Sequence, residues 1–253
     1  MENSLVSIII PAYNAEKYIE ETVQSALQSR YPFIEIIIVN DGSTDRTAEI
    51  IEKLAAENSL IKAYHQENKG SSAARNTAIA HSAGKYILPL DADDFISPDY
   101  IEKAVAVLET HPEVKVVYGD AMFFGEKNGL WRLPEFDINL LARRNIIYAS
   151  GIYRRKDFDQ TGGYCEDIAG MEDWDFWISM MKSGGEVHYI ESVVFYYRII
   201  SNSKRSQDLK KKKQIVDQLN SRHSEFFKQQ LGGKLHYNRS WSVLLNKLGI
   251  KGL

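Results

Sequence analysis

Short runs of β-branched and apolar residues alternate with amphipathic segments over residues 5–120. The runs LVSIII, IEIIIVN, IKAYHQ, KYILPL and VKVVYG have the length and composition of buried strands. Segments between them, such as EKYIEETVQSALQS and SPDYIEKAVAVLETH, place apolar residues at helical spacing. Apolar strands separated by helices are typical of a parallel sheet covered on both faces. We therefore predict a doubly wound, Rossmann-like α/β half.

The pattern changes after residue 120. The stretch AMFFGEKNGLWRLPEF predicts a hairpin that turns near residues 127–129, and WDFWISMMKSGG predicts a helix ended by glycines. EVHYIESVVFYYRII gives one or two strands, and the chain from about residue 206 is mostly helical. Because no Pro- or Gly-rich linker intervenes, we predict one domain over 1–205, divided near residue 120, and a helical extension over 206–253.

The net charge of −3 conceals an uneven distribution. From residue 201 onward there are 12 Lys and Arg against 3 Asp and Glu, or +9, which leaves −12 for residues 1–200. The KKKK stretch at 210–213 is either a solvated helix face or a contact with an anionic membrane surface. No apolar run approaches the ~20 residues of a membrane span, and the start lacks a basic n-region. We expect a cytoplasmic protein, with peripheral attachment at the inner face of the plasma membrane as the membrane alternative.

Composition removes several kinds of site. The single cysteine, Cys165, excludes an internal disulfide and a cysteine-based metal site. Neither a P-loop nor the glycine pattern of a dinucleotide fold is present, so ATP hydrolysis and hydride transfer lose support. We expect no nucleic-acid partner.

Polar stretches follow four of the predicted strands: PAYN, NDGSTD, NKGSSAARN and DADD. Ligands of such sheets bind beyond the carboxyl ends of the strands, so these stretches predict one crevice. Asp41 could accept a hydrogen bond from the imide N–H of uracil, or bind its own turn. Tyr13 could stack on a base, whereas Asn14 is favoured as the N-cap of the next helix. Arg75, one turn into a helix, could bind a phosphate or a surface carboxylate.

Two acidic clusters suggest chemistry. Asp91, Asp93 and Asp94 suit a hard divalent ion such as Mg²⁺ or Mn²⁺, unless Asp94 only begins the turn and another of the three caps the helix near residues 97–98. Glu172, Asp173 and Asp175 begin an aromatic helix, where acids favour the helix dipole. A carboxylate beside a bulky tryptophan could instead act as a general base.

The five stretches SIIIPAYN, IIVNDGSTD, NKGSSAARN, LPLDADD and EDWDFW, in this order, resemble family 2 glycosyltransferases of the GT-A fold over residues 6–198. The resemblance implies an inverting transfer from a nucleotide-sugar, usually a UDP-sugar, to a saccharide or lipid-linked acceptor. Residues 1–120 would then bind the nucleotide and 121–205 the acceptor. The nucleotide would be held by Pro11, Ala12, Tyr13, Asp41, Arg75, Asp91 and Ala92. Mn²⁺ or Mg²⁺ would be bound by Asp93 with Asp91, and Asp173 would be the catalytic base beside Glu172.

One position departs from the family pattern. Many relatives have YRxH near the end of the catalytic region, where this chain has Ile200, so a histidine contact to metal or diphosphate is missing there. His188 lies in a predicted strand and is interpreted as structural. The alternatives are a nucleotidyltransferase, whose glycine-rich basic loop is absent, and a catalytically inactive nucleotide-sugar-binding scaffold. A phosphatase would leave Asp41 unexplained.

Overall fold

The apolar runs of the first half of the chain form parallel strands of one sheet. The computed structural model describes residues 4–168, 170–200 and 204–236, with 204–210 as backbone only. Strand β1 (Val6–Ala12) pairs in parallel with β2 (Ile34–Asp41) and β4 (Tyr86–Pro89), and β3 (Ile61–Gln66) pairs in parallel with β2. The sequence of β2 lacks alternation because all eight of its residues are buried.

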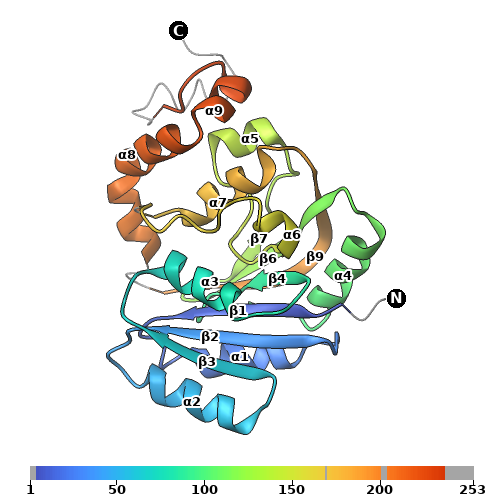
Figure 1. Cartoon of the computed structure of the whole chain (residues 1–253), viewed down its shortest axis with the longest axis vertical. Helices are drawn as coiled ribbons and strands as arrows, with labels where there is room; N and C mark the ends of the chain where they lie inside the picture. Colours follow the sequence, from blue (N-terminus) through green and yellow to red (C-terminus); the bar gives the residue numbers. More distant parts are fainter. Residues whose placement is uncertain (1–3, 169, 201–203, 237–253) are drawn as a thin grey trace.

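Helices cover both faces of these strands. They are α1 (Ile19–Leu27), α2 (Thr47–Glu57), α3 (Ser71–Ala80) and α4 (Tyr100–Thr110). In Figure 1, α1 and α2 lie below β1–β3 and α3 lies above them. Helix α1 buries Ile19, Val23 and Ala26, which share one helix face. This layering brings the carboxyl ends of β1, β2 and β4 to one edge of the sheet.

The sheet continues into the second half with mixed pairing, in the order β3-β2-β1-β4-β8-β6-β9-β5, and β7 lies beside β6. The added strands are β5 (Phe95–Ile96), β6 (Val114–Gly125), β7 (Gly129–Trp131), β8 (Ile152–Arg154) and β9 (Glu186–Ile199). The VKVVYG run, predicted to belong to the parallel half, forms β6, but β8 lies between β4 and β6 and is antiparallel to both. The side chain of Arg154 holds β8 there because it donates to the main-chain oxygens of Val114 and Leu108.

Two local predictions in this region are confirmed. Strands β6 and β7 form the expected hairpin, with Ala121 opposite Trp131. EVHYIESVVFYYRI forms the single strand β9, which includes His188 and pairs in parallel with β6 through irregular register near Gly119. Gly119 has no side chain to obstruct this pairing, whereas an added Cβ would lie 2.6 Å from the carbonyl oxygen of Ile190.

The remaining helices gather on one side of the sheet. They are α5 (Ile138–Arg143), α6 (Arg155–Phe158), α7 (Glu172–Met181), α8 (Lys204–Arg222) and α9 (Ser224–Leu231). Figure 1 shows α9 beside α5 and α8 leading up to it. Ile215 and Leu219 of α8 and Phe227 of α9 are fully buried in the main core. The described part of the 206–253 extension thus packs on the domain, and the division at residue 205 stays a prediction.

Candidate functional site

The loops after β1 and β2 are joined by side-chain hydrogen bonds. Asn14 has a positive φ of 49°, and its Oδ1 accepts from the backbone N of Thr44 at 2.8 Å. Helix α1 begins only at Ile19 and has no side-chain cap, so the prediction that Asn14 caps it is wrong. The amide side chain instead fixes the β1 loop against the β2 loop. The turn before α2 is closed by Asp45, whose Oδ1 accepts from Thr47 N at 3.0 Å.

Asp41 lies at the end of β2 and is 3% exposed. Its Oδ1 accepts from Gln66 Nε2 and from the backbone N of Lys69, and its Oδ2 accepts from the backbone N of Gly70, each at 2.8 Å. A carboxylate offers about four acceptor positions, so about one remains for a ligand. The contacts link β2 to the loop before α3 rather than closing the turn of Asp41 itself.

Tyr13 is the most accessible of the residues expected to hold the nucleotide. Its side chain is on the surface with the residue 52% exposed, whereas Ala12 is fully buried and Pro11 is half-buried. Pro11 and Ala12 lie opposite Val39 and Asn40 in the β1–β2 pairing. The three residues therefore occupy the carboxyl end of β1 that the sequence predicted, one strand away from Asp41.

Arg75 connects the two acidic clusters. It is 3% exposed, and its guanidinium donates to Asp91 Oδ1 at 2.5 Å and to Glu172 Oε1 at 3.1 Å. Ser71 Oγ also donates to Glu172 Oε1, at 2.5 Å. Burial disfavours the charged guanidinium, but the charges of Asp91 and Glu172 outweigh it and raise the pKa of Arg75. Arg75 thus pairs with two residues of the predicted site. These two pairs link the end of β4 to the start of α7.

The DADD turn is held by Arg198 of β9. The backbone N of Arg198 donates to Asp94 Oδ1 at 2.8 Å, and its Nε donates to the carbonyl oxygen of Asp93 at 2.8 Å. Asp94 is 1% exposed, so it is part of the structure of the turn. None of the three aspartates caps α4, because that helix begins after Asp99. Burial and the charge of Asp91 raise the pKa of Asp93 to about 6.

The start of α7 presents Asp173 from a strained turn. Met171, directly before the helix, has left-handed backbone angles (φ 54°, ψ 37°), which are costly for a residue with a Cβ. Asp173 Oδ2 accepts from Asn145 Nδ2 at 2.7 Å, and Oδ1 accepts from Trp174 N at 2.9 Å. Burial and the charge of Glu172 raise the pKa of Asp173 to about 6.

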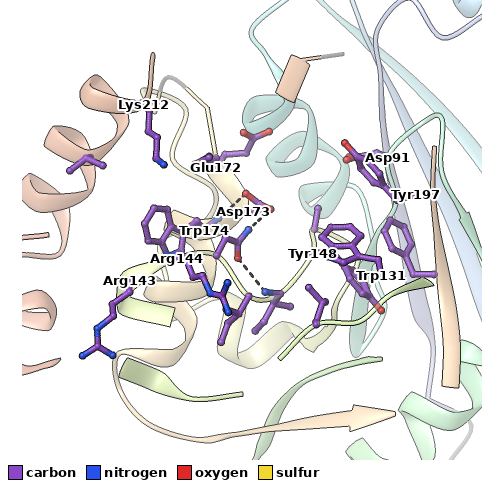
Figure 2. Close-up of a pocket in the computed structure, with 18 of the residues that line it drawn as sticks. Asp91, Trp131, Arg143, Arg144, Tyr148, Glu172, Asp173, Trp174, Tyr197 and Lys212 are labelled. Atoms are coloured by element: carbon purple, nitrogen blue, oxygen red, sulfur yellow. Dashed lines mark hydrogen bonds between the residues drawn. The ribbon is translucent and has the colours of Figure 1, made fainter. Parts of the chain in front are cut away.

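A cavity of about 410 Å³ lies in front of Asp173 (Figure 2). Four predicted site residues line it, namely Arg75, Asp91, Glu172 and Asp173. Six others do not, namely Pro11, Ala12, Tyr13, Asp41, Ala92 and Asp93. The structure therefore joins the predicted base to one end of the predicted nucleotide site, and the β1 and β2 loops lie outside this cavity.

Sequence reasoning missed part of the cavity wall. Asn145 follows α5 and orients Asp173, and Lys212, Val216 and Leu235 come from the C-terminal region. The available signal was the pair of apolar residues Ile215 and Val216, separated from the lysine run by one glutamine, which marks a helix with one buried face.

Asp175 anchors those C-terminal helices. It is fully buried, and its Oδ1 lies 2.8 Å from Arg222 Nε and 2.8 Å from His223 Nε2. Burial opposes the charged form, but hydrogen bonds from His223 and Arg222 lower the pKa of Asp175. The acids at the start of α7 thus divide their roles, because Asp173 faces the cavity and Asp175 faces α8 and α9.

The described residues lack both a metal-binding cluster and a helix fit to cross a membrane. No group of three or more His, Cys, Asp or Glu side chains forms a metal-binding cluster among residues 4–168, 170–200 and 211–236. Within residues 4–168, 170–200 and 204–236, no helix combines the length and the apolar character that crossing a bilayer requires.

Comparisons with known proteins agree with the motifs. The family model described as Glycosyl transferase family 2 matches residues 7–174. Chondroitin synthase of Pasteurella multocida is 31% identical over 219 residues, which cover 84% of this chain and 22% of that protein. Chondroitin synthase of Escherichia coli is 30% identical, with 80% and 30% covered. The chain thus spans less than a third of the length of these two relatives.

Solved structures share the fold. TarS of S. aureus in complex with UDP-GlcNAc has a TM-score of 0.69 and 23% identity, with 79% of this chain and 60% of that chain covered. A mannosyltransferase of Pyrobaculum calidifontis in complex with GDP-Man and Mn²⁺ has a TM-score of 0.69 and 21% identity, with 90% and 68% covered. These likenesses confirm the predicted α/β fold of the GT-A type.

Proposed function

The chain belongs to glycosyl transferase family 2, and from this premise we propose that it transfers a sugar from a UDP-sugar to a hydroxyl group of a saccharide or lipid-linked acceptor, with inversion. The observation that carries the proposal is the position of Asp173, which faces the same cavity as Asp91. A base and a nucleotide-side carboxylate at one cavity are what a single displacement at the anomeric carbon needs.

Asp173 is proposed as the general base. A pKa of about 6 leaves the carboxylate ionised at neutral pH and more basic than a surface aspartate. Asn145 fixes its Oδ2, so the other lone pairs can accept the proton of the acceptor hydroxyl while that oxygen attacks the anomeric carbon. Glu172, bound by Arg75 and Ser71, would contact donor or acceptor sugar rather than take the proton.

The nucleotide is proposed to lie along the carboxyl ends of β1, β2 and β4. The exposed ring of Tyr13 offers a face for the base, and the remaining acceptor position of Asp41 would receive the imide N–H of uracil. Arg75, Asp91 and the intervening Ala92 would complete the ribose and diphosphate end. The UDP-GlcNAc bound to TarS supports a uridine donor, although the mannosyltransferase carries GDP-Man on the same fold.

Mn²⁺ or Mg²⁺ fits the DADD turn. Burial and the charge of Asp91 raise the pKa of Asp93, so a divalent cation held by these aspartates would relieve their repulsion. Mg²⁺ typically uses one or two carboxylates and completes its shell with water and phosphate oxygens, which agrees with a site of two aspartates. When bound, the ion would neutralise the charge that develops on the departing diphosphate. Arg198 would keep the turn in place through Asp93 and Asp94.

The acceptor is proposed to be a growing polysaccharide of the bacterial surface. Support comes from the synthase relatives, which are named for chondroitin and hyaluronan. Lys211 and Lys213 are exposed on α8, so peripheral contact with an anionic membrane stays part of the proposal. Deleting the region after residue 206 would remove buried Leu219 and Phe227, so reversing the charge of the two lysines is the cleaner vesicle-binding test.

Nucleotide binding is tested first by thermal unfolding with UDP, GDP, dTDP and CMP, each with Mn²⁺ or with EDTA. A ligand at 100 times its Kd stabilises by about 2.7 kcal/mol, which raises the Tm by roughly 5–10 °C at this size. Stabilisation by UDP that EDTA removes supports the assignment. Preference for GDP overturns the assignment of uracil as the bound nucleobase. Absence of stabilisation by any nucleotide favours the inactive scaffold.

Catalysis is tested by Asp173→Asn in an assay of nucleotide release. Loss of a general base costs about 10²–10⁴-fold in kcat. Asp159→Asn, the same change at an exposed position, is the matched control and should retain full activity. Equal turnover of Asp173→Asn and wild type would remove the proposed base.

A further inference from the structure

The cavity in front of Asp173 has walls of opposite charge. Carboxylates of Asp91, Asp94, Glu172 and Asp173 line one part, and the cationic side chains of Arg143, Arg144 and Lys212 line another. Figure 2 draws these three cationic residues on one side of Asp173 and Asp91 on the other. Arg144 follows α5 and Lys212 lies on α8, so the cationic wall forms only where the C-terminal helices meet the domain.

Among the described residues nothing neutralises Arg144 or Lys212, whereas Arg143 donates to the carbonyl oxygen of Asn139. Within the described residues, no hydrogen bond or ion pair joins the side chain of Arg144 or of Lys212 to a carboxylate or a carbonyl. Arg75 on the acidic side is paired with two carboxylates. A charged side chain that lines a cavity without a partner leaves its donors available for an anionic ligand.

Aromatic rings line the cavity on the side of Asp173 where Asp91 lies, away from Arg144 and Lys212 (Figure 2). Trp131 is held by stacking on Phe123, with 4.9 Å between ring centroids, and Tyr148 stacks on Phe195 at 4.4 Å. Tyr197 stands nearly perpendicular to Trp131 at 5.6 Å. Fixed rings of this kind offer flat apolar faces, which suit the C–H face of a sugar ring. A sugar on these rings would have Asp173 at the edge that faces the cationic wall.

We propose that the acceptor sugar carries an acidic group, a carboxylate or a phosphate, which Arg144 and Lys212 bind while the reacting hydroxyl faces Asp173. This inference rests on the proposed function and specifies its acceptor. The donor diphosphate is assigned to the DADD turn, across the cavity from the cations, so it does not account for them. Without these cations, an acidic sugar would be repelled by Asp173 and Glu172.

Ligand-observed NMR on the nucleotide-free protein tests the inference. The probes are glucuronic acid, its neutral isostere glucuronamide, and glucose 6-phosphate compared with glucose. We expect each acidic sugar to bind about tenfold more tightly than its neutral counterpart, the scale of one charge-assisted hydrogen bond. The acidic probe with the larger preference identifies carboxylate or phosphate as the source. Equal binding of acidic and neutral sugars overturns the proposal.

Variants tie the preference to the cationic wall. Arg144→Ala and Lys212→Ala should each reduce the acid preference, and the double variant should abolish it. Lys213→Ala removes an exposed lysine that does not line the cavity and should leave the preference unchanged. An unchanged preference in the double variant overturns the assignment. A second result would also overturn it: Lys212→Ala loses binding to phosphatidylglycerol vesicles while the wild type shows no preference for acidic sugars. That result would assign the lysine to a lipid surface.

The outcome is separable from that of the proposed function. Acid binding is measured without nucleotide, whereas glycosyl transfer is measured by UDP-dependent stabilisation and by the Asp173→Asn variant. Acid preference without nucleotide binding would retain the anion site and remove the transferase proposal. UDP-dependent stabilisation without acid preference would retain the transferase and require a neutral acceptor.

Discussion

Asp175→Asn tests whether the C-terminal helices are held to the domain by one buried carboxylate. Asp175 accepts from Arg222 at 2.8 and 3.3 Å and from His223 at 2.8 Å, and it is fully buried. Asparagine keeps the shape but has one acceptor oxygen and no charge. Its amide group would face cationic or donor atoms of Arg222 and His223, so at least one buried donor loses its acceptor.

The magnitude follows from the burial of each partner. Hydrogen bonds to a charged group contribute about 1.5–3 kcal/mol each. The contribution of Arg222 is discounted because its side chain is 39% exposed and water can replace the carboxylate, whereas His223 is buried. We expect a loss of about 2–3 kcal/mol. At roughly 2–4 °C per kcal/mol for a domain of this size, the Tm should fall by about 5–10 °C.

Circular dichroism melting and limited proteolysis of α8 and α9 measure the effect. The lowered pKa of Asp175 means that its stabilisation is complete above the unfolded value of about 3.9 and is lost as pH falls through the lower folded value. The Tm difference between wild type and variant should therefore be full at pH 6–8 and shrink below pH 4. Asp217→Asn, an exposed acid on α8, is the matched control.

Equal Tm values for wild type and Asp175→Asn at pH 7 would refute this account. A fall of the same size in Asp217→Asn would refute it as well, since the effect would then come from the charge of α8 rather than from the buried network. A Tm difference that grows below pH 4 would contradict the sign of the pKa shift of Asp175.

Three further predictions follow from the site and the sheet. The value of kcat/KM should fall about tenfold per pH unit below pH 6 as Asp173 is protonated. Asn145→Ala should move this acidic limb of the pH–rate profile to higher pH, because it removes a donor to the charged form of Asp173. Coinciding profiles of wild type and variant would contradict the assignment of Asp173 as the general base. Asp93→Asn should abolish the Mn²⁺-dependent part of nucleotide stabilisation, and a Tm that still responds to EDTA would place the ion elsewhere. Gly84→Ala should lower the stability by about 1–3 kcal/mol in urea titrations, because its Cβ would lie 2.6 Å from a backbone nitrogen of β1, whereas Gly233→Ala has open space and should have no effect.

The local elements of the nucleotide half could be predicted from the sequence. Strand β2 reads as an unbroken apolar run because both of its faces are buried, and the β6–β7 hairpin follows from the predicted turn near residues 127–129. The expected N-cap at Asn14 failed for a nonlocal reason. Its side chain binds Thr44 in a loop 30 residues away, and no local pattern reports such a partner.

The sequence predicted only part of the site, because several of its contacts join distant segments of the chain. Short motifs indicated Asp91, Arg75 and Asp173 by type and order, because strand ends and helix starts are encoded locally. Their pairing was not encoded locally, since Arg75 reaches Glu172 across 97 positions of the chain. Asn145 lies in no recognised motif, and only its distance of 2.7 Å from Asp173 identifies it.

The sequence by itself thus determined the succession of strands and helices, the polar strand ends and the two acidic clusters, because these depend on periodicity and on neighbouring residues. Only the tertiary structure decided that β8 separates β4 from β6, that Asp175 binds α8 and α9, and that Lys212 reaches the cavity of Asp173. Each of these features joins segments distant along the chain. Their geometry follows from how buried side chains pack together, which a linear pattern of apolar and polar residues does not specify.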